Sequence, residues 1–359
     1  ESGTYTDFAN INLAGLLPDG RDGSNELTHM LLDIIDEMHL LQPSSNLQLS
    51  RKTPDAVLKH ALRVIRHGYG FPSIFNADAV IEEQVRQGKS LEDAREGGCS
   101  GCVETGAFGK EAYILTGYFN LVKILELALH DGNDPRTRKQ LGPRTGCAAD
   151  FATFDDVFAA FRKQLQHFLE IKIAGNQVIE RMYAALMPAP FLSVITDDCI
   201  WKGKDYNAGG ARYNHTFIQF VGIGSLTDSL SAIRQLVFDE GELSLEDLVA
   251  ALDADFAGRE PLRQRLVNRT PKYGNDDDRA DDLMVRAFNA VVEDVDGRPN
   301  TKGGCYRVEM LPTTCHVYFG SVTGAMPDGR KAGVAWSEGI SPGQGADRRG
   351  PTAVVKSAA

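Results

Sequence analysis

Apolar residues recur along this chain with the spacing of amphipathic helices over most of its length. The first such stretch, 25–41, is preceded by Ser24 and begins with Asn25, either of which is a suitable N-cap. A helix is also predicted to open at Thr53-Pro54-Asp55, with the proline at its first position. The same spacing predicts helices over 79–88, 111–131, 154–186, 225–238, 244–256 and 276–295.

Short apolar runs between these stretches have the length and composition of buried strands. They lie at 46–51, 71–78, 191–196, 215–224, 305–310 and 315–320. Strands that alternate with helices at this spacing indicate an α/β protein, with a barrel or a large mixed sheet covered by external helices. No internal repeat and no linker-like segment divides the chain.

Composition narrows the possible partners. The 359 residues carry a net charge of −11, which argues against a nucleic-acid partner because phosphate contacts need clustered Lys and Arg. No apolar run approaches the roughly 20 residues of a membrane span, so no membrane association is expected. The chain starts at Glu1 without a Met or a leader and ends without a tail. We therefore expect an internal piece of a longer polypeptide.

The six cysteines are too sparse for a disulfide scaffold and suit a reducing cytosol. Two of them, Cys99 and Cys102, lie in the glycine-rich segment GGCSGCVETG (97–106). A structural zinc site would need a second close pair of ligands, which the sequence lacks, so no metal is expected. A Cys-x-x-Cys interaction or redox module stays open as an alternative.

The same segment places Glu104 two residues after Cys102. In an extended loop, residues two apart project to the same side, so a thiol and a carboxylate would face one cavity. That pairing suits chemistry in which sulfur handles a hydrogen and the carboxylate handles a proton. The residues are equally compatible with an inert buried thiol and a helix-capping glutamate.

Two further polar groupings have structural as well as functional interpretations. Thr313, Thr314 and His316 crowd the start of the predicted strand at 315–320, where they suit either a bound polar ligand or an internal hydrogen-bond network. The aspartates of GNDDD (274–278) lack the alternation of a calcium loop and suit the N-terminus of the following helix.

Several segments together resemble one known family. The loop GCVE (101–104), with GRDGSNELTHMLLD, GGARYN, TPKYGNDDD, RVEMLPTTCHVYFG, PDGRKAG and SEGISP, resembles segments of the glycyl radical enzymes, the pyruvate formate-lyase-like lyases and decarboxylases, in family order. The resemblance covers essentially the whole chain, so 1–359 is interpreted as one partial barrel domain. It implies two half-barrel sheets surrounded by helices, with the cysteine loop inside.

The resemblance also implies a mechanism. Cys102 would form a thiyl radical that takes a hydrogen atom from the substrate, and Glu104 would be the acid/base partner. No bound cofactor is implied. The radical would be stored on a backbone glycine and installed by an activating enzyme that uses S-adenosylmethionine and an iron–sulfur cluster. A cytoplasmic, anaerobic homodimer is the family expectation.

Within the family, GCSGCVETG and FGKEAYILTGY most resemble the dehydratases that act on trans-4-hydroxy-L-proline. This implies removal of water to give 1-pyrroline-5-carboxylate. The residues implied to bind this small-molecule substrate are Ser2, Asp7, Phe8, Tyr118 and Thr313. A glycerol or propanediol dehydratase, or an arylacetate decarboxylase, is the alternative within the family.

The chain departs from the family pattern in one respect. A glycyl loop of the Arg-Val-x-Gly-Tyr type is missing, since 62–70 has the wrong spacing and 306–311 has no glycine. The glycine radical domain and the N-terminal region of the family are therefore expected to lie outside this chain. By itself the chain is expected to be inactive.

Overall fold

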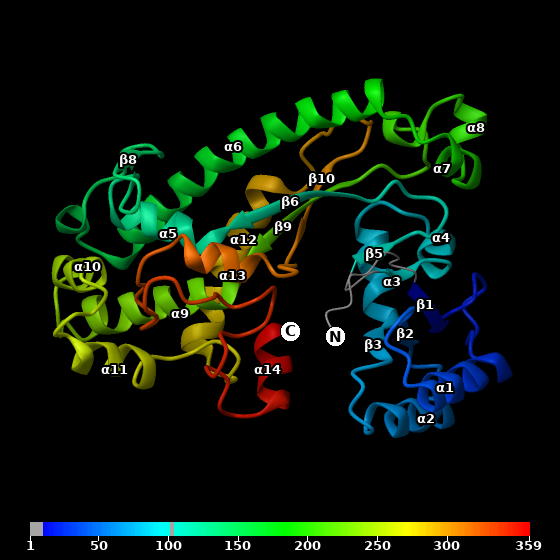
Figure 1. The fold of residues 1–359 in the computed structure, drawn as a ribbon, viewed down its shortest axis with the longest axis horizontal. Helices are drawn as coiled ribbons and strands as arrows, with labels where there is room; N and C mark the ends of the chain where they lie inside the picture. The colour runs from blue at the N-terminus through cyan, green and yellow to red at the C-terminus, as the bar shows by residue number, and fades with distance from the viewer. Residues whose placement is uncertain (1–9, 101–103) are drawn as a thin grey trace. The chain divides into compact units, whose positions relative to one another are not determined.

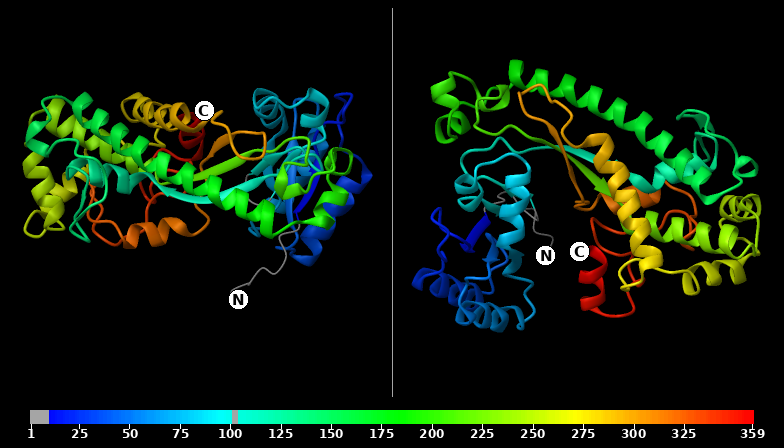
Figure 2. Two further views of the ribbon diagram at one scale, coloured as in Figure 1. Left: turned by 90° about the horizontal axis from the view of Figure 1, so that it is seen from above. Right: turned by 180° about the vertical axis from the view of Figure 1, so that it is seen from behind.

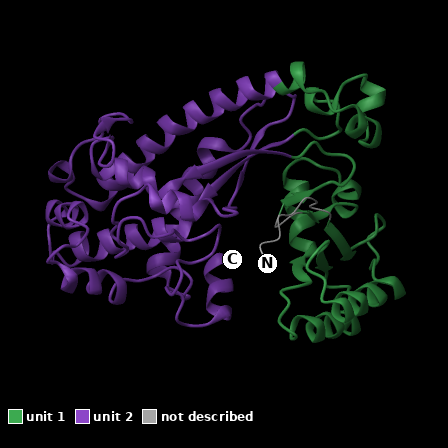
Figure 3. Ribbon diagram, in the orientation of Figure 1, with its two compact units in different colours: residues 1–113, 183–214 green, residues 114–182, 215–359 purple. Residues whose placement is uncertain are grey.

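The computed structural model describes residues 10–100 and 104–359. The chain divides into two compact units (Figure 3). Unit 1 comprises residues 1–113 and 183–214, and unit 2 comprises residues 114–182 and 215–359. Each unit is built around a three-stranded parallel sheet of its own.

In unit 1 the strand order is β1-β2-β3. The strands are β1 (Asn10–Ala14), β2 (Ser44–Leu49) and β3 (Ser73–Asn76), and the helices between and after them are α1 (Glu26–Met38), α2 (Asp55–Ile65), α3 (Ala77–Arg86) and α4 (Leu91–Arg95). Leu32 of α1, Leu47 of β2 and Ala61 of α2 are fully buried together. The predicted strands at 46–51 and 71–78 are thereby confirmed.

The helix starts of unit 1 follow local capping chemistry. Asn25 caps α1, and its side chain accepts a hydrogen bond from the Thr28 amide while the Thr28 hydroxyl accepts one from the Asn25 amide. Pro54 is the N-cap of α2 rather than its first helical residue, so that detail of the prediction is wrong by one position.

In unit 2 the strand order is β10-β9-β6 (Figure 1). The strands are β6 (Ile114–Asn120), β9 (Thr216–Val221) and β10 (Tyr306–Glu309), and the helices that contribute to their core include α5 (Leu121–Leu129), α6 (Phe154–Leu186), α9 (Ile223–Ile233) and α12 (Asp278–Val295). Figure 2 shows α6 as one unbroken helix, as its period predicted. The core includes the fully buried Phe161, Phe220 and Trp336.

Shorter elements complete the described chain. They are the hairpin strands β4 (Gly98–Ser100) and β5 (Glu104–Gly106), the strands β7 (Asn133–Asp134) and β8 (Lys139–Gln140), the helices α7 (Pro190–Ile195), α8 (Cys199–Lys202), α10 (Leu245–Asp253), α11 (Glu260–Asn268), α13 (Cys315–Ser321) and α14 (Pro351–Ala358), the 3-10 turns at Ala148–Asp150 and Tyr206–Ala208, and a π-helical turn at Arg234–Asp239. In the described part of the chain, no helix is both long and apolar enough to cross a membrane.

The helix predicted over 111–131 is wrong in its first half. Residues Ile114–Asn120 form strand β6, and helix α5 begins only at Leu121. Periodicity failed here because both elements are buried, and a continuous apolar run does not distinguish a strand from a helix. The side chain of Asn120 accepts a hydrogen bond from the Lys123 amide and so marks the change from strand to helix.

Two predicted strands are helices in the structure. Residues 191–195 belong to α7, which opens on Pro190 and has no buried residue, and Thr196 is its C-cap. Residues 315–320 belong to α13, of which only His316 and Gly320 are buried. In both cases an apolar run was interpreted as a buried strand, although most of its side chains lie partly or fully exposed.

The architecture is therefore mixed α/β, as predicted. Each unit contributes one parallel three-stranded sheet with helical crossovers. The strands of the described residues form open sheets and not a closed barrel.

Candidate active site

Unit 1 presents the cysteine segment as a β-hairpin. Strands β4 and β5 pair antiparallel, with Ser100 opposite Glu104. Cys102 lies between them in the sequence, at 101–103, outside the described residues. Glu104 is only 9% exposed, so its carboxylate is a buried group and not a surface charge. The alternative interpretation of Glu104 as the cap of a following helix is wrong, because Glu104 begins a strand.

The glycines of this segment permit very close packing. A Cβ at Gly97 would lie 2.2 Å from the carbonyl oxygen of Gly106, and one at Gly98 would lie 2.0 Å from Nε2 of Gln48. The Asn46 side chain donates a hydrogen bond of 3.0 Å to the carbonyl oxygen of Cys99. The hairpin is thus held directly against β2, and it needs glycine for steric reasons.

The buried Cys99 thiol is not available as a thiolate. Its side chain is fully buried, and burial, with the charges of Glu83 and Glu104, raises the pKa of its thiol to about 12. A thiol with that pKa stays protonated at neutral pH and is a poor metal ligand or redox partner. Across residues 10–100 and 104–359, no group of three or more His, Cys, Asp or Glu side chains is arranged to hold a metal ion.

Buried charges surround the hairpin on the side of α3. Lys89 and Glu111 form an ion pair of 2.5 Å in which both side chains are almost completely buried. Glu111 also accepts a hydrogen bond of 3.0 Å from the Ala107 amide, directly after β5. Glu83 bonds the Thr105 side chain, and burial raises the pKa of its carboxyl. Sequence analysis missed these three residues; a charged Glu111 within the predicted helix at 111–131 was the available signal.

The motif GGARYN (209–214) contacts helix α4, which precedes the hairpin, from the later segment of unit 1, residues 183–214. Arg212 donates hydrogen bonds of 3.0 and 3.1 Å to the two carboxylate oxygens of Asp93. Tyr213 donates one of 2.7 Å to the same carboxylate and accepts one from the Ser90 amide. These contacts hold the pKa of Asp93 at about 2 in spite of its burial. Asp93 therefore stays ionised and fixes α4, which leads into the hairpin.

Two of the predicted substrate residues meet in unit 2. Tyr118 lies on β6, and its phenolic oxygen is 2.8 Å from Oγ1 of Thr313, 195 positions further along the chain. Thr313 adopts a left-handed backbone conformation with φ of 41°, uncommon for a β-branched residue. The other three predicted substrate residues lie outside the described residues: they are Ser2, Asp7 and Phe8.

Comparisons with known proteins bear on the whole chain. Residues 1–320 match the family model described as pyruvate formate lyase-like. The chain is 56% identical over all 359 residues to a trans-4-hydroxy-L-proline dehydratase of Clostridioides difficile, of which it covers 46%. It is 33% identical to a (2S)-3-sulfopropanediol dehydratase of Klebsiella oxytoca, with 97% of this chain and 43% of that protein covered.

Solved structures also align with nearly the whole chain. The hydroxyproline dehydratase of Clostridioides difficile with trans-4-hydroxy-L-proline bound aligns with a TM-score of 0.96, covering 98% of this chain and 45% of that one. The glycerol-bound, B12-independent glycerol dehydratase of Clostridium butyricum aligns with a TM-score of 0.94 at 36% identity, covering 98% and 44%. The chain spans less than half the length of these relatives.

Proposed function

Because the chain belongs to the pyruvate formate lyase-like family of glycyl radical enzymes, we propose that it is part of a radical dehydratase for trans-4-hydroxy-L-proline. The observation that carries this proposal is the 56% identity, over the full length of the chain, to a protein with that activity. The glycerol dehydratase aligns almost as well in fold but at 36% identity, so sequence rather than fold favours the hydroxyproline substrate.

In the proposed reaction, Cys102 transfers a hydrogen atom and Glu104 transfers a proton. Cys102 would become a thiyl radical by giving its thiol hydrogen atom to the family's glycyl radical, when that radical is present. Cys102 then takes a hydrogen atom from the carbon beside the ring nitrogen of the substrate. Glu104 donates the proton with which the 4-hydroxyl leaves as water and regains one from the ring nitrogen, and return of the hydrogen atom from Cys102 to carbon 4 gives 1-pyrroline-5-carboxylate.

The setting of Glu104 supports the role of proton donor. It is buried in the hairpin that carries Cys102, and its strand is held by Glu111 through the Ala107 amide. A carboxyl fixed on a strand keeps one orientation toward the substrate better than one on a free loop. Cys99, with its thiol held protonated, takes no part.

The remaining proposed substrate contacts are polar groups with an aromatic ring, which suit a small hydroxylated ring that carries a carboxylate. They are Ser2, Asp7, Phe8, Tyr118 and Thr313. Of these, Tyr118 and Thr313 support each other by their 2.8 Å hydrogen bond. The proposed partners are a radical S-adenosylmethionine activating enzyme with an iron–sulfur cluster and a second copy of the polypeptide. The glycine radical domain is proposed to lie outside this chain.

The test is turnover by the complete polypeptide. Activated under anoxia by its radical S-adenosylmethionine partner, it should convert trans-4-hydroxy-L-proline into 1-pyrroline-5-carboxylate. Glu104→Gln should lower kcat by about 100-fold or more, because general acid catalysis of this kind contributes 10²–10⁴. It should leave the glycyl radical signal in electron paramagnetic resonance intact. Cys102→Ala should abolish turnover.

Three results would count against the proposal in different ways. Turnover by Cys102→Ala would contradict the thiyl mechanism. Unchanged turnover by Glu104→Gln would remove its role as proton donor. Activity on glycerol but not on trans-4-hydroxy-L-proline would leave the radical mechanism standing and refute the substrate.

A further inference from the structure

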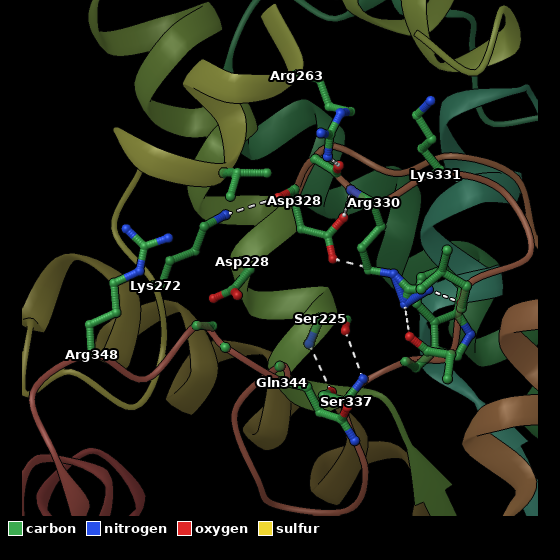
Figure 4. A pocket seen from close by; sticks show the side chains of 18 residues that line it. Ser225, Asp228, Arg263, Lys272, Asp328, Arg330, Lys331, Ser337, Gln344 and Arg348 are labelled. Atoms are coloured by element: carbon green, nitrogen blue, oxygen red, sulfur yellow. Dashed lines mark hydrogen bonds and ion pairs between the residues drawn. The ribbon is translucent and has the colours of Figure 1, made fainter. Parts of the chain in front are cut away.

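Unit 2 contains a second site candidate that the proposed dehydration does not use. It is a cavity of about 500 Å³ that shares no residue with the Tyr118–Thr313 pair. Its walls come from α9, α11 and two loops, 328–337 and 343–348 (Figure 4). We refer to it as the basic pocket. Its volume lies within the 300–1,000 Å³ that small-molecule sites typically have.

The pocket is basic although the chain is acidic. Five cationic side chains line it, against two carboxylates, in a chain of net charge −11. The cations are Arg263, Lys272, Arg330, Lys331 and Arg348, and the carboxylates are Asp228 and Asp328. Such a concentration of one sign in a cavity focuses the local potential and attracts anions.

Two of the five cations are already held in place by contacts within the protein. Arg263 binds both carboxylate oxygens of Glu260, at 2.6 and 2.8 Å. Arg330 stacks over the Trp336 ring at 3.8 Å, bonds the carbonyl oxygens at 334 and 335, and lies 3.9 Å from Asp328. These contacts make Arg263 and Arg330 parts of the wall.

The other three cations have hydrogen-bond donors available for a ligand. Lys272 bonds a backbone carbonyl, that of Asp328, at 3.2 Å, and Arg348 bonds the neutral side chain of Asn268 at 3.1 Å. Lys331 is exposed, and its charge acts on the nearby carboxyl of Glu260, which Arg263 already binds. The bonds of Lys272 and Arg348 go to neutral acceptors, and the charge of Lys272 is compensated in part by the nearby carboxyls of Asp228 and Asp328.

The acidic groups in the pocket offset this charge only in part. Asp228 accepts a hydrogen bond of 2.8 Å from the Tyr273 amide, and burial raises the pKa of its carboxyl to about 7. Burial also raises the pKa of Asp328, which accepts from the Arg330 amide. A carboxyl that is partly protonated at neutral pH neutralises less than one unit of positive charge.

The spare cations lie on two sides of the pocket. Figure 4 shows Lys272 and Arg348 on one side, with Asp228 beside them, and Lys331 on the opposite side. A single carboxylate would engage one side only. An anion with more than one charge spans the arrangement better, and phosphate is a multiply charged group that both Lys and Arg side chains bind.

We propose that the basic pocket binds a phosphate-bearing small molecule, with a phosphate group against Lys272 and Arg348. Lys331 then meets a second anionic group of the same ligand. The pocket shares no residue with the Tyr118–Thr313 pair, and trans-4-hydroxy-L-proline carries no phosphate. The binding therefore does not depend on the proposed function.

The test is calorimetric titration of the complete polypeptide with inorganic diphosphate and with inorganic phosphate, at constant ionic strength in chloride. We expect saturable binding of one diphosphate per chain, tighter than that of phosphate. Arg348→Glu should weaken diphosphate binding about tenfold or more, because it removes a charge-assisted contact and adds a like charge. Arg349→Glu is the matched control: the charge change is the same, but Arg349 bonds the Asn275 carbonyl oxygen and does not line the pocket.

Each outcome decides the proposal. Tighter binding of diphosphate identifies a ligand with two anionic groups, and equal binding of the two probes identifies a site for free phosphate or a single phosphate group. Absence of saturable binding would overturn the proposal. A pocket filled by another part of the polypeptide would give that result. Equal losses in Arg348→Glu and Arg349→Glu would also overturn it. If Arg348→Glu does not fold, Lys331→Glu takes its place, because that side chain is exposed.

Discussion

At the scale of single residues, this chain contains buried charges that its hydrophobic pattern does not reveal. Asp228 is the clearest case, since it lies on α9, a helix whose residues are all buried. The Tyr273 amide and the nearby charge of Lys272 favour its ionised form, but desolvation has the larger effect and raises the pKa of the carboxyl to about 7. The ordinary pKa of an aspartate carboxyl is 3.8, and we take this value for Asp228 in the unfolded chain.

This difference predicts a pH-dependent contribution to stability. Between about pH 4 and pH 7 the unfolded chain has lost the Asp228 proton while the folded chain retains it, so the contribution of Asp228 to the free energy of unfolding falls as pH rises. Asp228→Asn keeps an acceptor for the Tyr273 amide but cannot ionise. Relative to wild type, Asp228→Asn should therefore be more stabilising at pH 7 than at pH 5 in urea denaturation. A difference that does not change with pH would contradict the prediction.

At the scale of elements, the β4–β5 hairpin depends on close backbone approach. The carbonyl oxygen of Gly106 occupies the position that a side chain at Gly97 would need, 2.2 Å from an ideal Cβ. Backbone atoms of β5 cannot yield without moving Glu104, which lies on the same strand. The geometry of the proposed proton donor is thus tied to a steric requirement seven residues earlier in the chain.

Gly97→Ala should accordingly displace β5 and lower the free energy of unfolding by about 1–3 kcal/mol, the usual cost of overpacking. The matched control is Gly175→Ala within α6, where no atom outside the local helix backbone lies within 4 Å of the added Cβ. That change should stabilise by about 0.5–1 kcal/mol, because alanine favours the helix. Both values follow from chemical denaturation. Equal effects of the two substitutions would refute the steric argument.

At the scale of the whole molecule, the two units have cores of very different size. The core of unit 1 is a small cluster around Leu32, Leu47 and Ala61. The core of unit 2 joins the β10-β9-β6 sheet to several long helices and includes Phe161, Phe220 and Trp336. Buried apolar area is the main stabilising contribution, so the two units should differ in local stability.

Hydrogen exchange measured by mass spectrometry tests this difference. Peptides from α1, α2 and β2 should exchange at lower denaturant concentration than peptides from α9, α12 and β9, because opening the smaller core exposes less apolar surface. Inorganic diphosphate provides an internal comparison. Because the basic pocket is lined only by residues of unit 2, binding there should slow exchange in peptides of unit 2 and not in those of unit 1. Exchange of both sets in a single cooperative step would contradict independent cores.

The interpretation of the sequence succeeded where the signal was local. The 33-residue helix α6, the Asn25 cap of α1 and strands β2, β3 and β9 are all as predicted. It failed at β6, α7 and α13, where an apolar run had no period to distinguish strand from helix. The Lys89–Glu111 pair was also missed, because only folding brings the two charges together.

The sequence by itself determined the family and the order of most elements, because motifs and periods are properties of neighbouring residues, and it is the basis on which roles are proposed for Cys102 and Glu104. The tertiary structure decided which distant side chains meet. It pairs Tyr118 with Thr313, holds the hairpin against β2 through Asn46, and gathers the cations of the basic pocket from four separate segments. Burial also decided the protonation of Cys99 and Asp228, since desolvation depends on the surrounding fold and not on adjacent residues.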